Sequence, residues 1–350
     1  MVIFHIKSNM ALPSWIDFGI VNAVVAYGLW GVFPIYWKQL QDVPAVQLSM
    51  HRIVWSLFVL LAYIFATRQW TEFRRDAFTW RNVGMYASSA IFIAANWFLS
   101  VWAVNAGYIV ESSLGFFISP VITVLIGVIF FKEKLPMGQL AAIVVATAGM
   151  LVLAISYGKF PWISLSLALS FAGYGFVKKQ APLSSMQGLT LETIILFLPA
   201  LIYLIVEEAR GEGAFLHVDA VSNVLLVGSG VVTAIPLLLF SAAAKQIPLS
   251  TLGLLQYISP ILEFLCGVVI YHEAFSSMKL VGFIIVWTAL AIFSFEGLYT
   301  MHQARKKGET EPLVVDAADE NHESISFHLV EAQLSPSSVK SQNSSTSIHK

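Results

Sequence analysis

The chain consists of long apolar stretches separated by short polar connections. A helix needs about 20 mostly apolar residues to cross the roughly 30 Å hydrocarbon core of a bilayer. Ten such stretches are found, near residues 17–37, 45–66, 83–104, 111–131, 137–156, 161–177, 189–206, 221–244, 250–271 and 278–300. None alternates with the two-residue period of a membrane β-barrel strand. We therefore predict an all-α, polytopic membrane protein with ten transmembrane helices.

The composition excludes several other classes of protein. Hydrophobic residues make up 57% of the chain and charged residues 12%, against about 25% charged residues in an average soluble domain. The net charge of −1 gives no long-range attraction to nucleic acid. Cys266 is the single cysteine, which excludes intrachain disulfides and cysteine-based zinc sites. Motifs of soluble enzymes, such as a phosphate-binding loop, are absent, so we expect neither an enzyme nor a bound metal or cofactor.

The distribution of basic residues predicts the orientation in the membrane. Thirteen Lys and Arg residues lie on the side that holds the N-terminus and the even-numbered loops, and five lie on the other side. Basic residues accumulate on the cytoplasmic side, so we predict a multi-pass protein of the cell inner (cytoplasmic) membrane with both termini in the cytoplasm. Residues 1–16 form the N-terminal segment. Residues 301–350 form a polar tail that buries too little apolar surface to fold.

An internal repeat divides the apolar region into two halves. Ile118–Pro120 recurs as Ile258–Pro260, 140 residues later, and Trp30-Gly31 corresponds to Tyr174-Gly175. We predict one five-helix repeat over residues 17–156 and a second over 161–300. Because five is odd, the second repeat enters the membrane from the opposite side. Inverted repeats are typical of alternating-access transporters, whose solute site lies near the midplane between the repeats.

Two prolines occupy matched positions of these repeats. Pro120 and Pro260 each remove one backbone hydrogen bond in mid-membrane, which leaves a carbonyl for a neighbour, water or ligand. We predict that both act as hinges. The alternative is that each is a plain packing kink.

Ionisable residues at membrane depth are functional candidates because each costs about 3 kcal/mol to place at the bilayer centre. Glu263 is the deepest and is a candidate proton carrier, or else a neutral Glu bonded to another helix. Arg52 would bind a carboxylate or phosphate, with His51 beside it and Trp55 stacking an organic ring. Alternatively, Arg52 extends to the outer interface and His51 is structural. Glu192, at the repeat position of His51, is either a coupling carboxylate or a salt-bridge partner.

Neutral polar and aromatic residues complete the predicted site. Asn96 and Gln256 lie in mid-membrane, where an amide either contacts the solute or joins two helices. Four aromatic residues neighbour repeat-matched or proline-disrupted positions and are predicted to line the cavity: Tyr27, Trp30, Tyr174 and Tyr257.

Several short motifs are also similar to those of a known family. They are Trp30-Gly31 with Pro34, Tyr36 and Lys38; His51–Ser56; Asn96-Trp97; Trp102–Asn105; Glu111–Gly115; Phe117–Pro120; Glu192-Thr193; Pro236-Leu237; Ser250–Gly253; and Gln256–Pro260. Together they resemble the RarD proteins, in the EamA group of the drug/metabolite transporter superfamily. The resemblance covers about residues 15–300. It implies a ten-helix inner-membrane carrier for a small organic metabolite or drug, with helices 1–4 and 6–9 around a central cavity and helices 5 and 10 at the periphery.

These observations favour a secondary transporter that exports small organic metabolites or drugs by alternating access. Its expected partners are the solute, membrane lipid and protons as coupling ion, but no nucleic acid; the sequence leaves the oligomeric state open. The alternative is an intramembrane enzyme that acts on lipid-linked substrates. It would need an acid, a base and a nucleophile at one depth, whereas His51 and Glu192 are predicted to face opposite leaflets. A channel would need rings of like charge or a carbonyl filter, and neither is visible.

Overall fold

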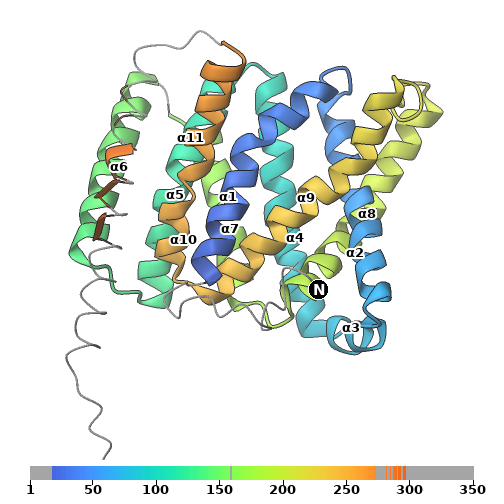
Figure 1. Cartoon of the computed structure of the whole chain (residues 1–350), viewed down its shortest axis with the longest axis horizontal. Coiled ribbons are helices and arrows are strands. Elements are labelled where there is room, and N and C mark those ends of the chain that lie inside the picture. The colour runs from blue at the N-terminus through green and yellow to red at the C-terminus, as the bar shows by residue number, and fades with distance from the viewer. Residues whose placement is uncertain are drawn as a thin grey trace, which may run out of the picture. The chain divides into compact units, whose positions relative to one another are not determined.

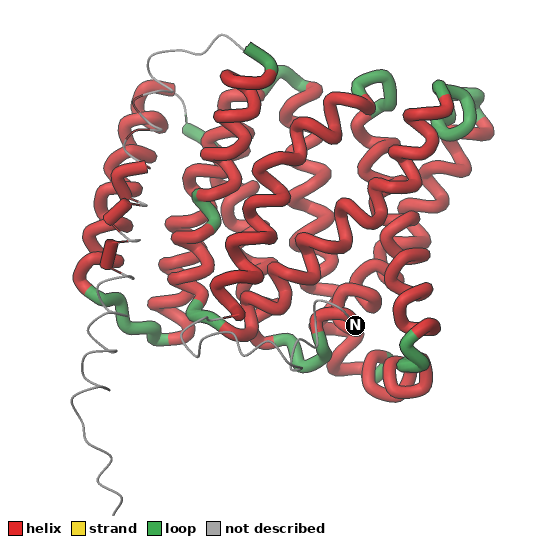
Figure 2. The backbone as a smooth tube through the Cα atoms, viewed as in Figure 1, coloured by secondary structure: helices red, strands yellow, loops and turns green. Residues whose placement is uncertain are grey.

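A computed structural model describes residues 18–157 and 160–272, together with 281, 284, 287–289, 291–292 and 295–296. The regular elements of these residues are all helical, without a strand (Figure 2). In chain order they are α1 (Phe18–Trp37), a 3₁₀ turn (Lys38–Leu40), α2 (Ala45–Ala66), α3 (Trp70–Ala77), α4 (Trp80–Asn105), α5 (Ile109–Phe131), α6 (Met137–Tyr157), α7 (Trp162–Gln180), α8 (Ser185–Ala209), α9 (Ala220–Gln246), α10 (Leu249–Leu255), α11 (Ile258–Leu265) and a π-helical turn (Cys266–Ile270).

The long helices follow the apolar pattern of the sequence. Seven helical segments within the described residues are long and apolar enough to cross a membrane: Phe18–Leu40, Ala45–Ala66, Trp80–Val104, Glu111–Phe131, Ser185–Ala209, Ala220–Gln246 and Leu249–Ile270. The predicted spans 137–156 and 161–177 also fall on helices, α6 and α7, but neither is among these seven segments. Most of the predicted span 278–300 lies outside the described residues. The described part of the chain is thus all-helical, and its several long apolar helices support a multi-pass membrane protein.

The structure differs from the predicted spans in two places. The polar connection after α2 contains the short helix α3, whose buried residues Phe73 and Ala77 pack with Ile64 of α2. The predicted span 250–271 is not one continuous helix, because Gln256 and Tyr257 form a turn between α10 and α11. Pro260 follows this turn, and a proline has no N–H to continue the helical hydrogen bonds from the preceding turn.

Side chains at the helix ends fix where several helices begin. The hydroxyl oxygens of Thr79 and Ser184 accept hydrogen bonds from the first turns of α4 and α8. Asp219 accepts from the backbone N–H groups of Val221 and Ser222 at the start of α9. Such caps satisfy backbone donors that lack a partner inside the helix.

The first helices of the two predicted repeats run in opposite directions (Figure 1). Ser259 donates to the Tyr27 carbonyl, and Cys266, later in the chain, donates to the Gly31 carbonyl, later in α1. Helix α1 is therefore parallel to the α11 segment. The α10–α11 segment is antiparallel to α5, because Leu249 bonds to Glu133 while Gln256 bonds to Ser119. Helix α7 is parallel to α5, since Ser164 bonds to Glu111 and Phe176 lies against Phe131. Therefore α1 and α7 are antiparallel.

Helix α6 has few neighbours among the described helices. Its main helical neighbour is α5. Ala142, Ile143 and Ala146 of α6 join a buried cluster that also includes Ala289. The backbone N–H of Gly138 donates to the Glu296 carboxylate over 3.0 Å. These contacts connect α6 with the described residues of the predicted span 278–300.

Candidate functional site

A cavity of about 360 Å³ lies among α1, α2, α4, α5, α7, α9 and the α10–α11 segment. It occupies the half of the bundle in which α1 and α4 end and α2, α5 and α7 begin. This volume is within the range of small-molecule sites. Seven of the predicted site residues line it: Tyr27, Trp30, Arg52, Asn96, Gln256, Pro260 and Glu263.

Arg52 is the cation of this cavity. Its Nε donates to the Thr233 hydroxyl over 2.9 Å. Its guanidinium lies 4.8 Å from the ring centroid of Trp37 and 4.7 Å from that of Trp97. Two tryptophans and one hydrogen bond therefore hold the guanidinium in place, and it forms no ion pair with any described residue.

The sequence predicted that Trp55 stacks an organic ring at the site, and it named no aromatic partner for Arg52. Trp55 is not among the residues that line the cavity. Its ring centroid lies 5.6 Å from that of Phe58 and 5.7 Å from that of Phe215. Helical spacing placed Trp55 near His51 but carried no information about α1 and α4, which supply Trp37 and Trp97. The sequence signal that could have found Trp97 is its position next to Asn96.

Glu263 lines the same cavity from α11 and is partly exposed there. Among the described residues it has neither an ion-pair partner nor a hydrogen-bond partner. Cavity residues thus include one cation and one acidic group that do not neutralise each other.

Two buried polar atoms of the cavity lining have no hydrogen-bond partner within the part of the chain that the structure describes. They are the Tyr27 hydroxyl and Oε1 of Gln256. The other side of the Gln256 amide donates from Nε2 to Ser119 over 2.8 Å, which fixes the amide at the turn between α10 and α11. Leaving a buried polar group unsatisfied costs about 1–3 kcal/mol, so these atoms mark positions where a ligand or water would be stabilised.

Asn96 joins two helices at the cavity wall. Its Nδ2 donates to the Leu167 carbonyl over 2.9 Å and to the Ser170 hydroxyl over 3.1 Å. Both amide donors therefore hold α4 against α7. Of the two roles that the sequence left open, the structure shows the joining of two helices, and contact of Asn96 with a solute stays a prediction.

Aromatic rings pack closely beside the cavity. Phe240 of α9 contacts aromatic residues of α1 and α7. Its ring centroid lies 5.5 Å from those of Tyr174 and Phe171 in α7 and 5.7 Å from that of Trp30 in α1. Tyr27 lies 6.2 Å from the same ring. Sequence reasoning missed Phe240, because nothing in its local pattern separates it from other apolar residues of α9.

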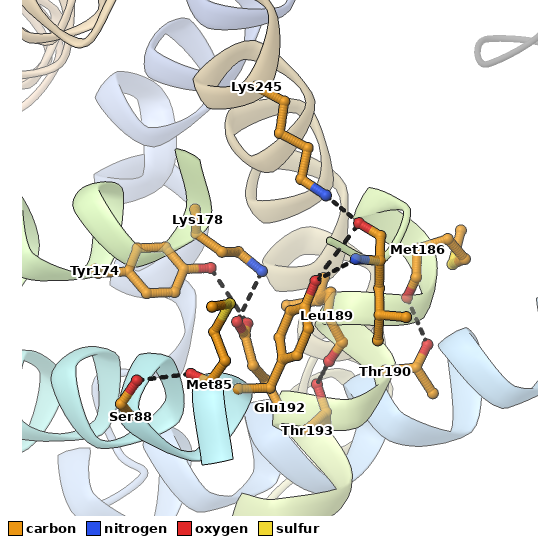
Figure 3. Close-up of polar contacts among 12 residues, drawn as sticks. Met85, Ser88, Tyr174, Lys178, Met186, Leu189, Thr190, Glu192, Thr193 and Lys245 are labelled. Atoms are coloured by element: carbon orange, nitrogen blue, oxygen red, sulfur yellow. Dashed lines mark hydrogen bonds and ion pairs between the residues drawn. The ribbon is translucent and has the colours of Figure 1, made fainter. Parts of the chain in front are cut away.

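A buried polar cluster lies near the end of α7 and the start of α8, away from the cavity. Figure 3 shows its side chains. Lys178 of α7 and Glu192 of α8 form an ion pair of 2.8 Å, with side chains 0% and 2% exposed. The Tyr174 hydroxyl donates to the same carboxylate over 3.5 Å. The Lys178 ammonium also lies 5.6 Å from the ring centroid of Tyr86 and 5.4 Å from that of Tyr174. In this conformation Glu192 is thus a salt-bridge partner, one of the two roles considered for it.

Further contacts close this end of the bundle. The Glu133 carboxylate accepts from the backbone N–H groups of Leu249 and Ser250 over 2.7 and 2.8 Å. Lys179 lies 3.8 Å from Glu133, and Lys245 donates to the Leu183 carbonyl (Figure 3). These bonds connect the ends of α5, α7 and α9 with the start of α10 and the residues that precede α8.

The remaining predicted residues lie outside the cavity. The His51 ring lies 5.4 Å from Phe215, and the Tyr257 hydroxyl donates to the Phe117 carbonyl over 3.2 Å. Tyr174 and Glu192 line a separate void of about 20 Å³. Pro120 lies within the continuous helix α5, unlike its repeat partner Pro260. No three His, Cys, Asp or Glu side chains of the described residues gather where they could hold a metal ion.

Known proteins resemble this chain over most of its length. The EamA-like transporter family matches residues 17–155 and 161–295. Protein RarD of Streptomyces exfoliatus is 42% identical over 291 residues, which are 83% of this chain and 92% of that protein. The uncharacterized transporter YojE of Bacillus subtilis is 42% identical over 79% of this chain and 93% of its own. Protein RarD of Escherichia coli is 38% identical over 82% and 97%.

A solved crystal structure shows the same fold. It superimposes with a TM-score of 0.61 at 18% sequence identity, over 79% of this chain and 96% of that one.

Proposed function

The chain belongs to the EamA-like transporter family, and from this premise we propose that it is a secondary transporter of small organic metabolites or drugs. It works in the cytoplasmic membrane by alternating access and exports its solute. Residues 17–156 and 161–300 are its two inverted five-helix repeats, and both termini lie in the cytoplasm.

The cavity is the observation that carries this proposal. Its walls come from both halves of the chain, with Tyr27, Arg52 and Ser119 from the first and Gln256 and Glu263 from the second. Transporters with inverted repeats hold their solute between the repeats. The unpartnered Tyr27 hydroxyl and Gln256 oxygen provide donor and acceptor positions for a solute.

Three further observations support inverted repeats. The family matches the chain in two successive segments, and α1 and α7 are antiparallel. The packing also repeats, since α1 lies against α9 and α11 as α7 lies against α4 and α5. The matched segments nevertheless differ, because α5 is continuous at Pro120 while the chain turns before Pro260. Alternating access needs such a difference, because each repeat adopts in one state the shape that the other repeat takes in the next.

The positions of the cavity and of the buried polar cluster support a proposal about the conformational state. The cavity lies in the half that the basic residues predict to be the outer half. The Lys178–Glu192 pair and the Glu133 contacts lie near the predicted cytoplasmic ends of the helices. We infer that the conformation is outward-facing, with the ion pair and the rings around Phe240 as the closed inner gate. Protons couple through Glu192 and Glu263, and Pro120 and Pro260 are the hinges.

Site-directed labelling tests the alternating-access part of this proposal. Cys266→Ser removes the single native cysteine, and Ser100→Cys and Thr193→Cys then place one thiol each at the cavity and at the inner void. With an impermeant maleimide, we expect Ser100→Cys to be labelled from the outside and Thr193→Cys from the inside. A transported solute should change the two labelling rates in opposite directions. If both rates change in the same direction, alternating access is refuted.

Solute flux in proteoliposomes tests the transport itself. We expect solute efflux that depends on an imposed pH gradient, and loss of that dependence in Glu192→Gln and Glu263→Gln. The matched control is Glu208→Gln, at an exposed carboxylate beyond the cavity. If both variants keep the pH dependence of the parent protein, protons do not couple through these carboxylates.

A further inference from the structure

A second hollow, a groove of about 400 Å³, lies at the surface between the start of α4 and the end of α7. Its lining includes Trp80, Arg81, Gly84 and Ser88 of α4, and Phe176 and Gln180 of α7. The groove shares no lining residue with the central cavity. The solute of the cavity therefore does not account for it.

The groove runs from the membrane surface into the hydrocarbon. Arg81 precedes the predicted span 83–104, and Gln180 follows the predicted span 161–177, so both polar side chains lie at the predicted cytoplasmic surface. The groove continues to Ser88, five residues inside the first of these spans, which is about 7 Å along a helix. It thus reaches about half the depth of one leaflet, since the whole hydrocarbon core is roughly 30 Å thick.

The face of α4 on which the groove opens is exposed. A methyl group at Gly84 would meet nothing within 4 Å among the described residues. Ile91, seven residues later on the same face of α4, is 66% exposed, and Trp80, four residues earlier, is 92% exposed. Tryptophan is enriched where the hydrocarbon meets the headgroups. This face therefore suits contact with lipid at both depths.

Arg81 brings a charge without a counter-charge to the headgroup level. It is exposed and forms neither an ion pair nor a hydrogen bond with any described residue. Arg75, by contrast, is paired with Asp76 at 2.7 Å. The start of α4 is fixed, because Thr79 accepts from the backbone N–H of Asn82 over 3.3 Å, and Asn82 Nδ2 donates to the Asp76 carbonyl over 2.7 Å.

The two ends of the groove together define the class of ligand. Residues 67–81 contain four arginines and two acidic residues, and basic segments beside a membrane attract anionic headgroups. A guanidinium binds a phosphate through two parallel hydrogen bonds. Below the headgroup level, the ring of Phe176 is held against α5, with its centroid 5.3 Å from that of Phe130 and 5.5 Å from that of Phe131. A free phosphate would leave this apolar part unused, whereas an acyl chain fills it.

We propose that the groove binds one anionic phospholipid of the cytoplasmic leaflet. Its phosphate pairs with Arg81, the amide of Gln180 donates to the headgroup, and one acyl chain lies against Phe176. The lipid holds α4 against α7 beside the buried polar cluster, because Val177 also lines the groove and directly precedes Lys178. This proposal requires insertion in a membrane but not transport of a solute.

Lipid binding to the purified full-length protein in detergent tests this proposal. Dioleoyl phosphatidylglycerol is the anionic probe, and phosphatidylcholine with the same chains is the neutral control. Native mass spectrometry measures the affinity of each lipid, and the rise in melting temperature measures binding independently. Because the choline cation neutralises its own phosphate, phosphatidylglycerol should bind at least about tenfold more tightly.

Variants separate this groove from a general basic surface. In Arg81→Gln the preference for phosphatidylglycerol should disappear, and Arg81→Lys should retain part of it. Arg74→Gln removes the same charge from α3, outside the groove, and should change the preference by less than about twofold. Gly84→Leu fills the groove and should weaken both lipids by at least about tenfold. Gly28→Leu, at a glycine of α1 that also has nothing within 4 Å, should weaken neither. Each preference is a ratio within one variant, so it does not depend on that variant's stability.

The refuting results are equally specific. Equal affinities of the two lipids for the parent protein, or equal losses in Arg81→Gln and Arg74→Gln, would show attraction to the basic surface as a whole. Displacement of phosphatidylglycerol by an equal concentration of glycerol 3-phosphate would show a site for free phosphate. Unchanged binding in Gly84→Leu would place the lipid elsewhere. If the expected ratios are found but no solute moves in proteoliposomes, the transport function is wrong and the lipid site stands.

Discussion

The buried ion pair between Lys178 and Glu192 gives the sharpest test of the energetics of this protein. The perturbations are Lys178→Met and Glu192→Leu, separately and together. Each single change leaves one charge on a side chain that is at most 2% exposed. Removing one partner of a buried pair costs about 3–5 kcal/mol, whereas replacing both with apolar residues is often neutral or stabilising.

The structure defines what each remaining charge would meet. Without Glu192, the described contacts that remain to the Lys178 ammonium are the rings of Tyr86 and Tyr174, whose centroids are more than 5 Å away. Without Lys178, Glu192 keeps the Tyr174 hydroxyl at 3.5 Å. Neither environment replaces an ion pair of 2.8 Å, so both single changes should be strongly destabilising.

Thermal unfolding in detergent measures these effects. One kcal/mol corresponds to about 2 °C for a protein of this size, so each single variant should melt about 6–10 °C below the parent. The double variant should melt within about 2 °C of the parent. Asp76→Asn, at the solvent-exposed Arg75–Asp76 pair, is the control and should leave the melting temperature unchanged. If the double variant loses as much as the two single variants combined, the two charges do not form a coupled pair.

Three further predictions address the helix packing, a helix cap and the inner gate. A methyl group at Gly230 would overlap the backbone of Trp55, whereas nothing lies within 4 Å of a methyl group at Gly28. Gly230→Ala should therefore lower the melting temperature clearly more than Gly28→Ala. Equal losses would contradict the close crossing of α2 and α9. Hydrogen bonds from Ser222 and Val221 hold the pKa of Asp219 below its ordinary value of 3.8. The ionised Asp219 carboxylate at the start of α9 therefore stabilises the fold at pH values above 3.8. This stabilisation is lost as the pH falls through the lowered pKa. Melting curves against pH should show a smaller acid loss for Asp219→Asn than for the parent, and an unchanged acid slope would refute this. Glu133→Ala removes the carboxylate that accepts from the backbone N–H groups of Leu249 and Ser250. In a Cys266→Ser background, this change should increase maleimide labelling of Thr193→Cys from the inside. An unchanged labelling rate would show that these hydrogen bonds do not close the inner end.

The sequence alone determined the helical character of the chain and most helix positions. Runs of about 20 apolar residues leave the backbone no alternative to helix in a bilayer, so α2 and α9 fall within a few residues of their predicted spans. The resemblance to the RarD proteins, read from short motifs spread over the chain, is confirmed by RarD relatives that are 42% and 38% identical. The choice of Arg52 and Glu263 as candidate site residues followed from the cost of placing an ionisable group within an apolar span.

The tertiary structure decided which side chains meet. Helical periodicity relates residues on one helix, so it placed Trp55 beside His51, but it could not show that the guanidinium of Arg52 lies between Trp37 of α1 and Trp97 of α4. The Lys178–Glu192 pair joins α7 to α8, and the aromatic contacts of Phe240 join α9 to α1 and α7. The turn at Gln256 was also outside the reach of the local pattern, because Pro120 in a matching motif leaves α5 continuous. The apolar pattern records the environment of each helix, while the choice of neighbours depends on packing between distant segments, which no local pattern contains.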